Sequence, residues 1–178
     1  MKRLLNILLI LISTLGYSQS NPELDVFKKV INYEIEKGNS GIYLQCEKSK
    51  TFFNAKDFKE QTLLQVPLNI LKELEQKAEN SNEGRWSSDL LTDLKYGSDF
   101  IKTKTCLSKK DSENLFESTG ARQSIISISE AIFDENYENC VISVTYGKFR
   151  GSAYGHSYFL KKVYGVWTVV TTYNHWMT

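Results

Sequence analysis

The sequence predicts an α+β fold in which N-terminal helices pack on an antiparallel sheet of about four to six strands. The first half carries apolar residues at helical spacing, and residues 140–146 alternate with a period of two. Near the end, Tyr164-Gly165 separates two β-rich runs, as expected of a hairpin. No Pro/Gly-rich linker divides the chain, so residues 19–178 are expected to form a single α+β domain.

Residues 1–18 are typical of a secretory signal peptide. Lys2 and Arg3 precede a short apolar run that ends in small residues. The run is shorter than the roughly 20 residues that cross a bilayer. We expect cleavage after Ser18, with Ser20 as the alternative, export to the periplasm or outside the cell, and no membrane insertion afterwards.

The charge balance argues against a nucleic-acid partner. Removing Lys2 and Arg3 from the 22 basic residues leaves 20, against 21 acidic residues. A nearly neutral chain has no electrostatic basis for binding a polyanion. The partners we expect are an unknown small molecule or an exported protein.

The first predicted helix covers residues 22–37. Asn21 is a favourable N-cap and Pro22 a favourable first helical residue. The apolar residues that recur at helical spacing are Leu24, Phe27, Val30, Ile31 and Ile35. Gly38 follows as a helix end. We expect this helix to lie across the sheet with its apolar stripe in the core.

The middle of the chain contains weaker signals. Alternation predicts a strand over Ile42–Cys46, whereas residues 51–65 are ambiguous. A second helix is predicted to start at Pro67. Its apolar face would comprise Leu68, Leu71, Leu74 and Ala78, and Glu73 and Lys77 would form an i,i+4 pair.

Three further segments precede the predicted sheet. Ser88-Asp89 is the expected cap of a short helix that runs through Leu94. Residues 101–107 alternate weakly and are expected to form a strand. Residues 111–118 are expected to be either a helical turn or a loop.

The predicted sheet occupies the last third of the chain. Its strands are expected within 125–133, at 140–146, at 157–163 and at 166–173, with a turn at 134–139. The last strand is apolar or Thr on both faces, which predicts a strand that is central or covered on both sides.

A glycine-rich stretch, residues 147–156, lies between two predicted strands. Its glycines and its cations Lys148 and Arg150 would suit an anion-binding loop. The alternative, which we favour, is a long hairpin connection whose glycines relieve backbone strain. Neither a Walker pattern nor a dinucleotide fingerprint is present.

Cys46, Cys106 and Cys140 remain after signal cleavage. An odd number in an exported protein allows one disulfide and one free thiol, and all three pairings stay open. Buried free thiols are equally compatible with the apolar patterns around Cys46 and Cys140. No cysteine or histidine spacing matches a zinc site, so we expect no metal and no cofactor.

His156 is the one candidate for catalysis, because a histidine beside a hydroxyl is the minimum for nucleophilic chemistry. It precedes Ser157, but no Gly-x-Ser-x-Gly elbow accompanies the pair. We therefore assign no catalytic residue beyond this candidate. His175 is expected to be a strand-end residue that packs beside Trp176.

The chain ending, Tyr158–Lys162 followed by Gly165–Val170, resembles the final hairpin of small exported bacterial proteins of uncharacterised function. It also resembles the closing strands of NTF2-like and cystatin-like domains. The resemblance covers about fifty residues and implies a helix that wraps a curved antiparallel sheet. It assigns no catalytic residue to this chain.

We expect a non-catalytic exported domain that binds a ligand or another protein. Its contact residues would be Lys148, Phe149, Arg150, Tyr154 and His156, with the rings of Tyr146 and Tyr158 beside them, since aromatic rings next to arginine are typical of contact hot spots. One alternative is a small hydrolase or isomerase that uses His156 and a nearby acid in a cone-shaped pocket. Another alternative is an inhibitor or immunity-type protein.

Overall fold

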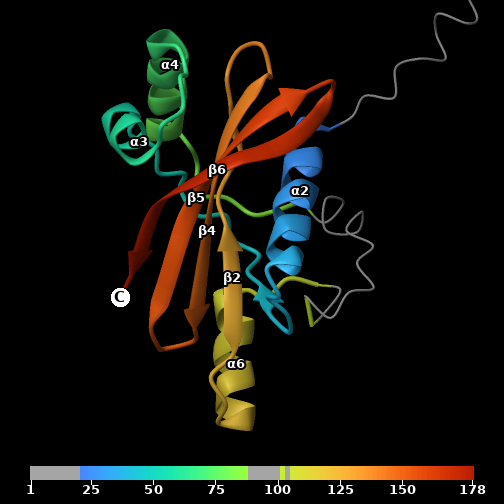
Figure 1. Ribbon diagram of the computed structural model, residues 1–178. Coiled ribbons are helices and arrows are strands. Elements are labelled where there is room, and N and C mark those ends of the chain that lie inside the picture. Colours follow the sequence, from blue (N-terminus) through green and yellow to red (C-terminus); the bar gives the residue numbers. More distant parts are fainter. Residues whose placement is uncertain (1–20, 88–100, 103–104) are drawn as a thin grey trace, which may run out of the picture.

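The computed structural model describes residues 21–87, 101–102 and 105–178. It shows a six-stranded, mostly antiparallel sheet with helices on both faces, which confirms the α+β class (Figure 1). The strands lie in the order β1-β2-β4-β5-β6, and β3 pairs with β4. The likeness to NTF2-like and cystatin-like domains stays a prediction.

Four helices and six strands are described. The helices are α2 (Pro22–Glu36), α3 (Ala55–Gln61), α4 (Leu68–Glu79) and α6 (Lys109–Thr119). The strands are β1 (Tyr43–Leu44), β2 (Ser124–Ile128), β3 (Ile132–Phe133), β4 (Asn139–Lys148), β5 (Ala153–Val163) and β6 (Val166–Met177).

Helix α2 forms as predicted. The Asn21 side chain accepts hydrogen bonds from the backbone N–H groups of Glu23 and Leu24, which satisfies two of the free donors at the helix start. Gly38 ends the helix region with φ +85°, a conformation that favours glycine. The buried face comprises Val26, Phe27, Val30, Ile31 and Glu34.

The segment that was ambiguous in sequence contains α3, whose start is capped by the Asn54 side chain. Helix α4 begins directly after Pro67, and its Lys77 Nζ lies 2.7 Å from Glu73 Oε1, as the i,i+4 spacing predicted. Both helices pack on the sheet face opposite α2 (Figure 1).

Two corrections concern the edges of the sheet. The strand predicted over Ile42–Cys46 is only β1, and it pairs parallel with β2 rather than antiparallel. The last strand, predicted to be central or covered, is the edge strand β6. It contacts α2 and α3, but only Trp167 and Tyr173 are buried within it. Its β-branched residues reflect strand propensity rather than burial on both faces.

The glycine-rich stretch is mostly strand, so the prediction of a long loop over 147–156 is wrong. Antiparallel pairing runs from β4 into β5 through Gly147↔Ala153, leaving only a tight turn between them. Gly155 lies inside β5, where an added Cβ would come within 2.7 Å of the Val144 carbonyl oxygen and 2.8 Å of the Trp176 ring. Glycine there permits close packing of neighbouring strands.

The predicted turns form. In the β5–β6 hairpin, Val163 pairs with Val166 across Tyr164 (φ +49°) and Gly165 (φ +80°). At the turn before β4, Asp134 Oδ1 accepts the backbone N–H of Asn139 at 2.9 Å.

The β-branched run over 125–133 is interrupted. Strands β2 and β3 both pair with β4, and the break between them lies at residues 129–131. Ser129 bridges the break, since its N–H donates to the Ser143 carbonyl oxygen at 2.9 Å.

The sheet separates two apolar clusters. On the α2 face the cluster includes Phe27, Ile31, Ile142 and Leu160. On the α3/α4 face it is smaller and more aromatic, and it includes Phe53, Phe58, Leu71, Leu74, Phe159 and Tyr173. Strand β5 contributes side chains to both clusters because its side chains alternate between the two faces of the sheet.

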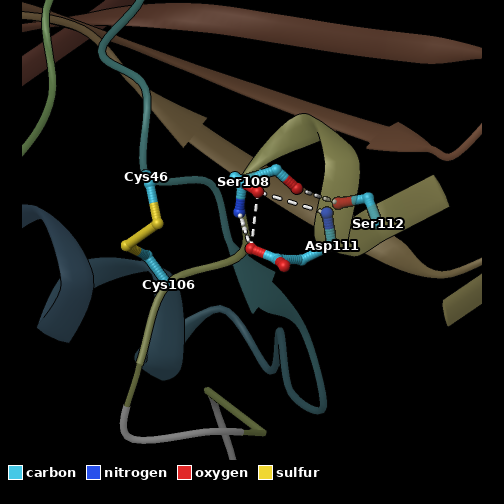
Figure 2. Close-up of a disulfide and its surroundings, with 5 residues drawn as sticks. All are labelled: Cys46, Cys106, Ser108, Asp111 and Ser112. Atoms are coloured by element: carbon cyan, nitrogen blue, oxygen red, sulfur yellow. Dashed lines mark hydrogen bonds between the residues drawn. A yellow bond between two sulfur atoms is a disulfide. The ribbon is translucent and has the colours of Figure 1, made fainter. Parts of the chain in front are cut away.

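A disulfide joins Cys46 to Cys106, 60 residues apart in sequence, and resolves the pairing that the sequence left open (Figure 2). Cys140 is a free thiol in the core, and burial raises its pKa well above the ordinary value. The thiol therefore stays protonated and packs as a small apolar group.

Helix α6, which the sequence left as either a helical turn or a loop, begins just after the disulfide. The Ser108 hydroxyl accepts the backbone N–H of Asp111, and the Asp111 carboxylate accepts the N–H of Ser108, forming a capping box (Figure 2). Of the strand predicted over 101–107, residues 103–104 lie outside the described residues, and Ile101 and Leu107 form isolated bridges to Ile42 and Gln45.

The short helix predicted over residues 88–94 lies outside the described residues. Of the helices that are described, none combines the length and the apolar character needed to cross a bilayer.

Candidate functional site

A buried carboxylate lies on the α2 face of the sheet. Glu34, in the last turn of α2, is fully buried. Its Oε2 accepts hydrogen bonds from the Tyr146 hydroxyl at 2.6 Å and from Asn39 Nδ2 at 2.7 Å. Its Oε1 lies 3.2 Å from His156 Nε2 and 3.4 Å from Lys37 Nζ. Four polar groups, two from the segment that follows α2 and one each from β4 and β5, therefore converge on one carboxylate.

These partners keep Glu34 ionised. Burial alone would raise the pKa of Glu34. Hydrogen bonds from His156 and Tyr146 and the charge of Lys37 together lower it by more, so the pKa lies below its ordinary value. The pKa of Tyr146 is raised by burial and by the adjacent Glu34, so this hydroxyl remains a protonated donor. The arrangement is a carboxylate with a fixed set of donors.

His156 and Tyr158 extend the network along β5. His156 Nε2 lies 2.8 Å from the Tyr158 hydroxyl, which also accepts a hydrogen bond from Lys37 Nζ at 3.0 Å. The His156 ring stacks on His175 of β6 with a centroid distance of 5.3 Å. Burial, together with the charges of His156 and Lys37, lowers the pKa of His175. The His175 ring thus stacks on His156, and the expected packing of His175 beside Trp176 stays a prediction.

The sheet extends past the end of the helix that covers this face. Glu34 bonds to Tyr146 two residues before α2 ends. The β4–β5 hairpin reaches beyond this end of the helix (Figure 1). Because Tyr146 pairs with Tyr154 and Lys148 with Ser124, all four side chains share the α2 face of the sheet. Among the described helices, none is placed above this part of the sheet beyond the end of α2.

A hollow of about 370 Å³ lies at this place. Its walls come from the loop after α2, the start of β2 and the β4–β5 hairpin, and its lining includes Asn39, Ser40, Ser124, Tyr146, Lys148, Ser152 and Tyr154. The volume falls within the roughly 300–1,000 Å³ typical of small-molecule sites.

Two stacked tyrosine rings connect the hollow to the buried network. Tyr146 and Tyr154 stack at 5.1 Å with an interplanar angle of 16°. Tyr154 is 46% exposed, whereas Tyr146 is buried and bonds to Glu34 through its hydroxyl. Asn39, which also lines the hollow, donates to the same carboxylate. Glu34 thus fixes two parts of the hollow's wall from behind.

The residues predicted as contacts divide into three groups. Lys148 and Tyr154 line the hollow. His156 lies behind it, 8% exposed and bonded within the network. Phe149 and Arg150 belong to the turn between β4 and β5 and contact α6 instead, with Arg150 2.8 Å from an α6 carboxylate.

The predicted patch of exposed rings is therefore not continuous. Tyr146 and Tyr158 are buried, and Phe149 packs on Phe116 of α6 at 5.6 Å. Of the rings named for that patch, Tyr154 is the exposed one.

Sequence reasoning missed Glu34. Its position gave a usable signal, because it follows Phe27 and Ile31 at the spacing of one helix face. A carboxylate on an apolar stripe is buried and needs partners. The partners, Tyr146 and His156, come from strands more than a hundred residues away, so the network itself had no local signature.

A second, more open hollow of about 550 Å³ lies between α4 and β3. Its lysine, Lys77, is already bonded to Glu73 and to the Phe133 carbonyl oxygen. None of the contact residues predicted from sequence lines it. In the described parts of the chain, no group of three or more His, Cys, Asp or Glu side chains is arranged to hold a metal ion.

Comparisons with family models, curated proteins and solved structures found no match to this chain. The site is therefore interpreted from its geometry and chemistry.

Proposed function

We propose that this chain is an exported binding protein for a small molecule, and that the hollow beyond α2 is its site. The observation that carries the proposal is the hollow itself, which joins an exposed ring and a cation to a wall fixed by a buried carboxylate. Binding sites combine apolar surface with a few polar groups held in fixed positions. Lys148 and Tyr154, chosen from sequence as contact residues, both line this hollow.

Export is part of the proposal. The composition of residues 1–18 supports a signal peptide, and the Cys46–Cys106 disulfide supports an oxidising compartment such as the periplasm or the extracellular space. The two observations come from different parts of the chain and agree.

The polar network supports a role in preorganising a binding site rather than a role in catalysis. His156 Nε2 is occupied by Glu34 and the Tyr158 hydroxyl, and His156 does not line the hollow. A general base needs direct or water-mediated reach to the proton that it removes. Glu34 instead holds Tyr146 and Asn39 at the hollow's wall, which reduces the ordering cost of ligand binding.

The second candidate is the hydrolase or isomerase that uses His156. The 3.2 Å contact between Glu34 Oε1 and His156 Nε2 favours it, because an acid that orients a histidine is a recurrent catalytic pair. Turnover of p-nitrophenyl esters that is lost in His156→Asn and kept in Tyr154→Ala would replace the binding proposal with this one.

The proposal is tested by a thermal-shift screen of small sugars, acids, nucleotides and lipids on the purified chain. A ligand at 100 times its dissociation constant stabilises by roughly 2.7 kcal/mol. This should raise the unfolding midpoint by roughly 5–10 °C for a domain of this size. Hits are then titrated into isotope-labelled protein by NMR, which locates the perturbed residues.

A matched pair of tyrosine variants locates the site. We expect Tyr154→Ala to abolish the shift and Tyr164→Ala to keep it, because Tyr164 is a fully exposed tyrosine on the distant β5–β6 turn. Hits that persist in Tyr154→Ala would show that the hollow is not the site.

A further inference from the structure

The chemistry of the hollow narrows the class of ligand, an inference that rests on the proposed binding function. Its walls carry side-chain hydroxyl and amide groups from Asn39, Ser40, Ser124 and Ser152. Such groups each offer a donor and an acceptor. A ligand without hydroxyls would leave them unpaired on desolvation, which costs affinity.

The hollow also carries one cation. Lys148 lines it and is exposed, and within the described residues its ammonium takes part in none of the ion pairs, all of which involve other cations. None of the residues that line the hollow is acidic. Behind the tyrosines, the Glu34 carboxylate pairs with the ammonium of Lys37 and lies within hydrogen-bonding distance of His156. An anionic group on the ligand would therefore find a partner without a repelling neighbour.

The exposed ring supplies the third element. Tyr154 keeps nearly half of its surface exposed, although its ring is held in place against Tyr146. A tyrosine fixed in this way presents apolar surface at low entropic cost. The C–H face of a saccharide ring offers apolar surface that can stack on such a ring, and its hydroxyl groups are donors and acceptors that suit the polar walls.

We propose that the ligand is a sugar acid, a saccharide ring that stacks on Tyr154 while its carboxylate pairs with Lys148. The ring hydroxyls bond to the serine and asparagine side chains that line the hollow. No covalent step is involved. The assignment accounts together for the ring, the hydroxyl-rich walls and the single cation.

Three probes of similar size separate these elements. D-glucuronate carries both the hydroxylated ring and the carboxylate, D-glucose lacks the carboxylate, and benzoate lacks the hydroxyls. In NMR titrations we expect glucuronate to bind about tenfold more tightly than either of the others, the effect of one charge-assisted contact or of several unpaired hydroxyls.

Two lysine variants test the role of the charge. Lys148→Gln should weaken glucuronate binding to the level of glucose and leave glucose binding unchanged. Lys72→Gln, which removes an exposed lysine from α4, should change neither. The ring is tested in the same way, because Tyr154→Ala should abolish binding of both sugars and Tyr154→Phe should retain it.

The outcomes separate this inference from the proposed function. Equal binding of glucose and glucuronate, tightest binding of benzoate, or equal loss of both sugars in Lys148→Gln overturns the sugar-acid assignment and leaves the hollow as a binding site. If none of the three probes binds while another compound perturbs Tyr154, the assignment also fails and the site stands. If no compound perturbs Tyr154, both proposals fail.

Discussion

On the α3/α4 side of the sheet the core is made of aromatic and aliphatic side chains, whereas on the α2 side a similar core contains a charged network. Phe58 packs against Phe159 and Tyr173 at 5.0 Å on the first side. On the second side, Glu34 in the last turn of α2 lies 3.2 Å from His156 of β5. The same sheet thus supports two cores of different chemistry.

The difference between the two cores identifies residues whose presence is not explained by the stability of the fold alone. A buried ion pair is weak evidence for stability, because apolar residues of similar size often stabilise as well or better. The α3/α4 core follows the simple rule of apolar packing. The α2 side departs from it most clearly at Glu34, which is fully buried next to the hollow, and we propose that this carboxylate serves the site rather than the fold.

The largest effect is expected on the apolar side. Phe58→Ala should lower the free energy of unfolding by about 3–5 kcal/mol, because it removes a fully buried ring from three aromatic contacts. Urea unfolding measures the loss. Leu63→Ala is the control, since Leu63 is 99% exposed and should cost almost nothing. A loss of less than about 1 kcal/mol for Phe58→Ala would contradict the packing described for this face.

The disulfide belongs to the other side of the comparison. Cys106 packs against the α2-face cluster, and the bond to Cys46 restrains a long stretch of unfolded chain. The double substitution Cys46→Ser/Cys106→Ser should lower the free energy of unfolding by about 2–4 kcal/mol. Thermal unfolding with and without dithiothreitol checks this, since the reductant should destabilise the natural chain and leave the double variant unchanged. A midpoint that dithiothreitol lowers equally in both proteins would refute the role of this bond.

The network itself should contribute less. Glu34→Gln keeps the shape but removes the charge that four donors share, so we expect a loss of about 1–3 kcal/mol. Glu113→Gln is the matched control, because Glu113 is half-exposed and bonded only to Arg150 in the ion pairs described. If Glu34→Gln costs no more than the control in urea unfolding, the network does not stabilise the α2 side.

Acid titration sharpens the same contrast. The folded-state pKa of Glu34 lies below its ordinary value of 4.5, so its contribution to stability is complete above pH 4.5 and is lost as the pH falls through the folded-state value. Glu34→Gln should lack this loss. The pKa of His175 is lowered from 6.5, so stability should also fall as the pH drops below 6.5, equally in both proteins.

Thermal midpoints measured between about pH 7 and pH 3 separate the two groups. The curves of the natural chain and Glu34→Gln should run in parallel near pH 6 and converge below about pH 4.5. Parallel curves over the whole range would show that folding leaves the pKa of Glu34 unchanged, because a stability difference that does not vary with pH requires the same pKa in the folded and unfolded chains.

The elements with local signals were predictable from the sequence. Asn21 and Pro22 mark the start of α2, and Tyr164-Gly165 marks the final hairpin, because caps and tight turns depend on a few neighbouring residues. The glycine-rich segment misled the prediction for the opposite reason. Gly147 and Gly155 suggested a loop locally, but pairing with distant strands keeps both in the sheet.

The candidate site was only partly predictable. Lys148 and Tyr154 were chosen as an aromatic and basic pair, and both line the hollow. Glu34 carried the signal of an acid on an apolar stripe, but its partners depend on how far the sheet extends past α2, which no local pattern encodes. The position of α2 along β4 determines which of their side chains come into contact, and this position is a property of the whole fold.

The smallest effect is expected at Arg150, which the sequence placed in the contact surface and the structure places on α6. Its guanidinium bonds to Glu113 at 2.8 Å and lies 5.4 Å from the Phe116 ring centre, with both charged partners about half-exposed. Exposed ion pairs contribute about 0–1 kcal/mol, so Arg150→Ala should shift the unfolding midpoint by no more than about 4 °C.

Ligand binding at the hollow should be unchanged in Arg150→Ala and reduced in Lys148→Gln, although the two cations are separated by one residue only. Lys148 lies on the α2 face of β4, whereas Arg150 follows in the turn at φ +55° and contacts α6. A titration of both variants with the same ligand therefore tests the boundary of the site. Equal weakening by both would extend the site across the turn to α6, and the division between a binding face and a supporting contact would then fail.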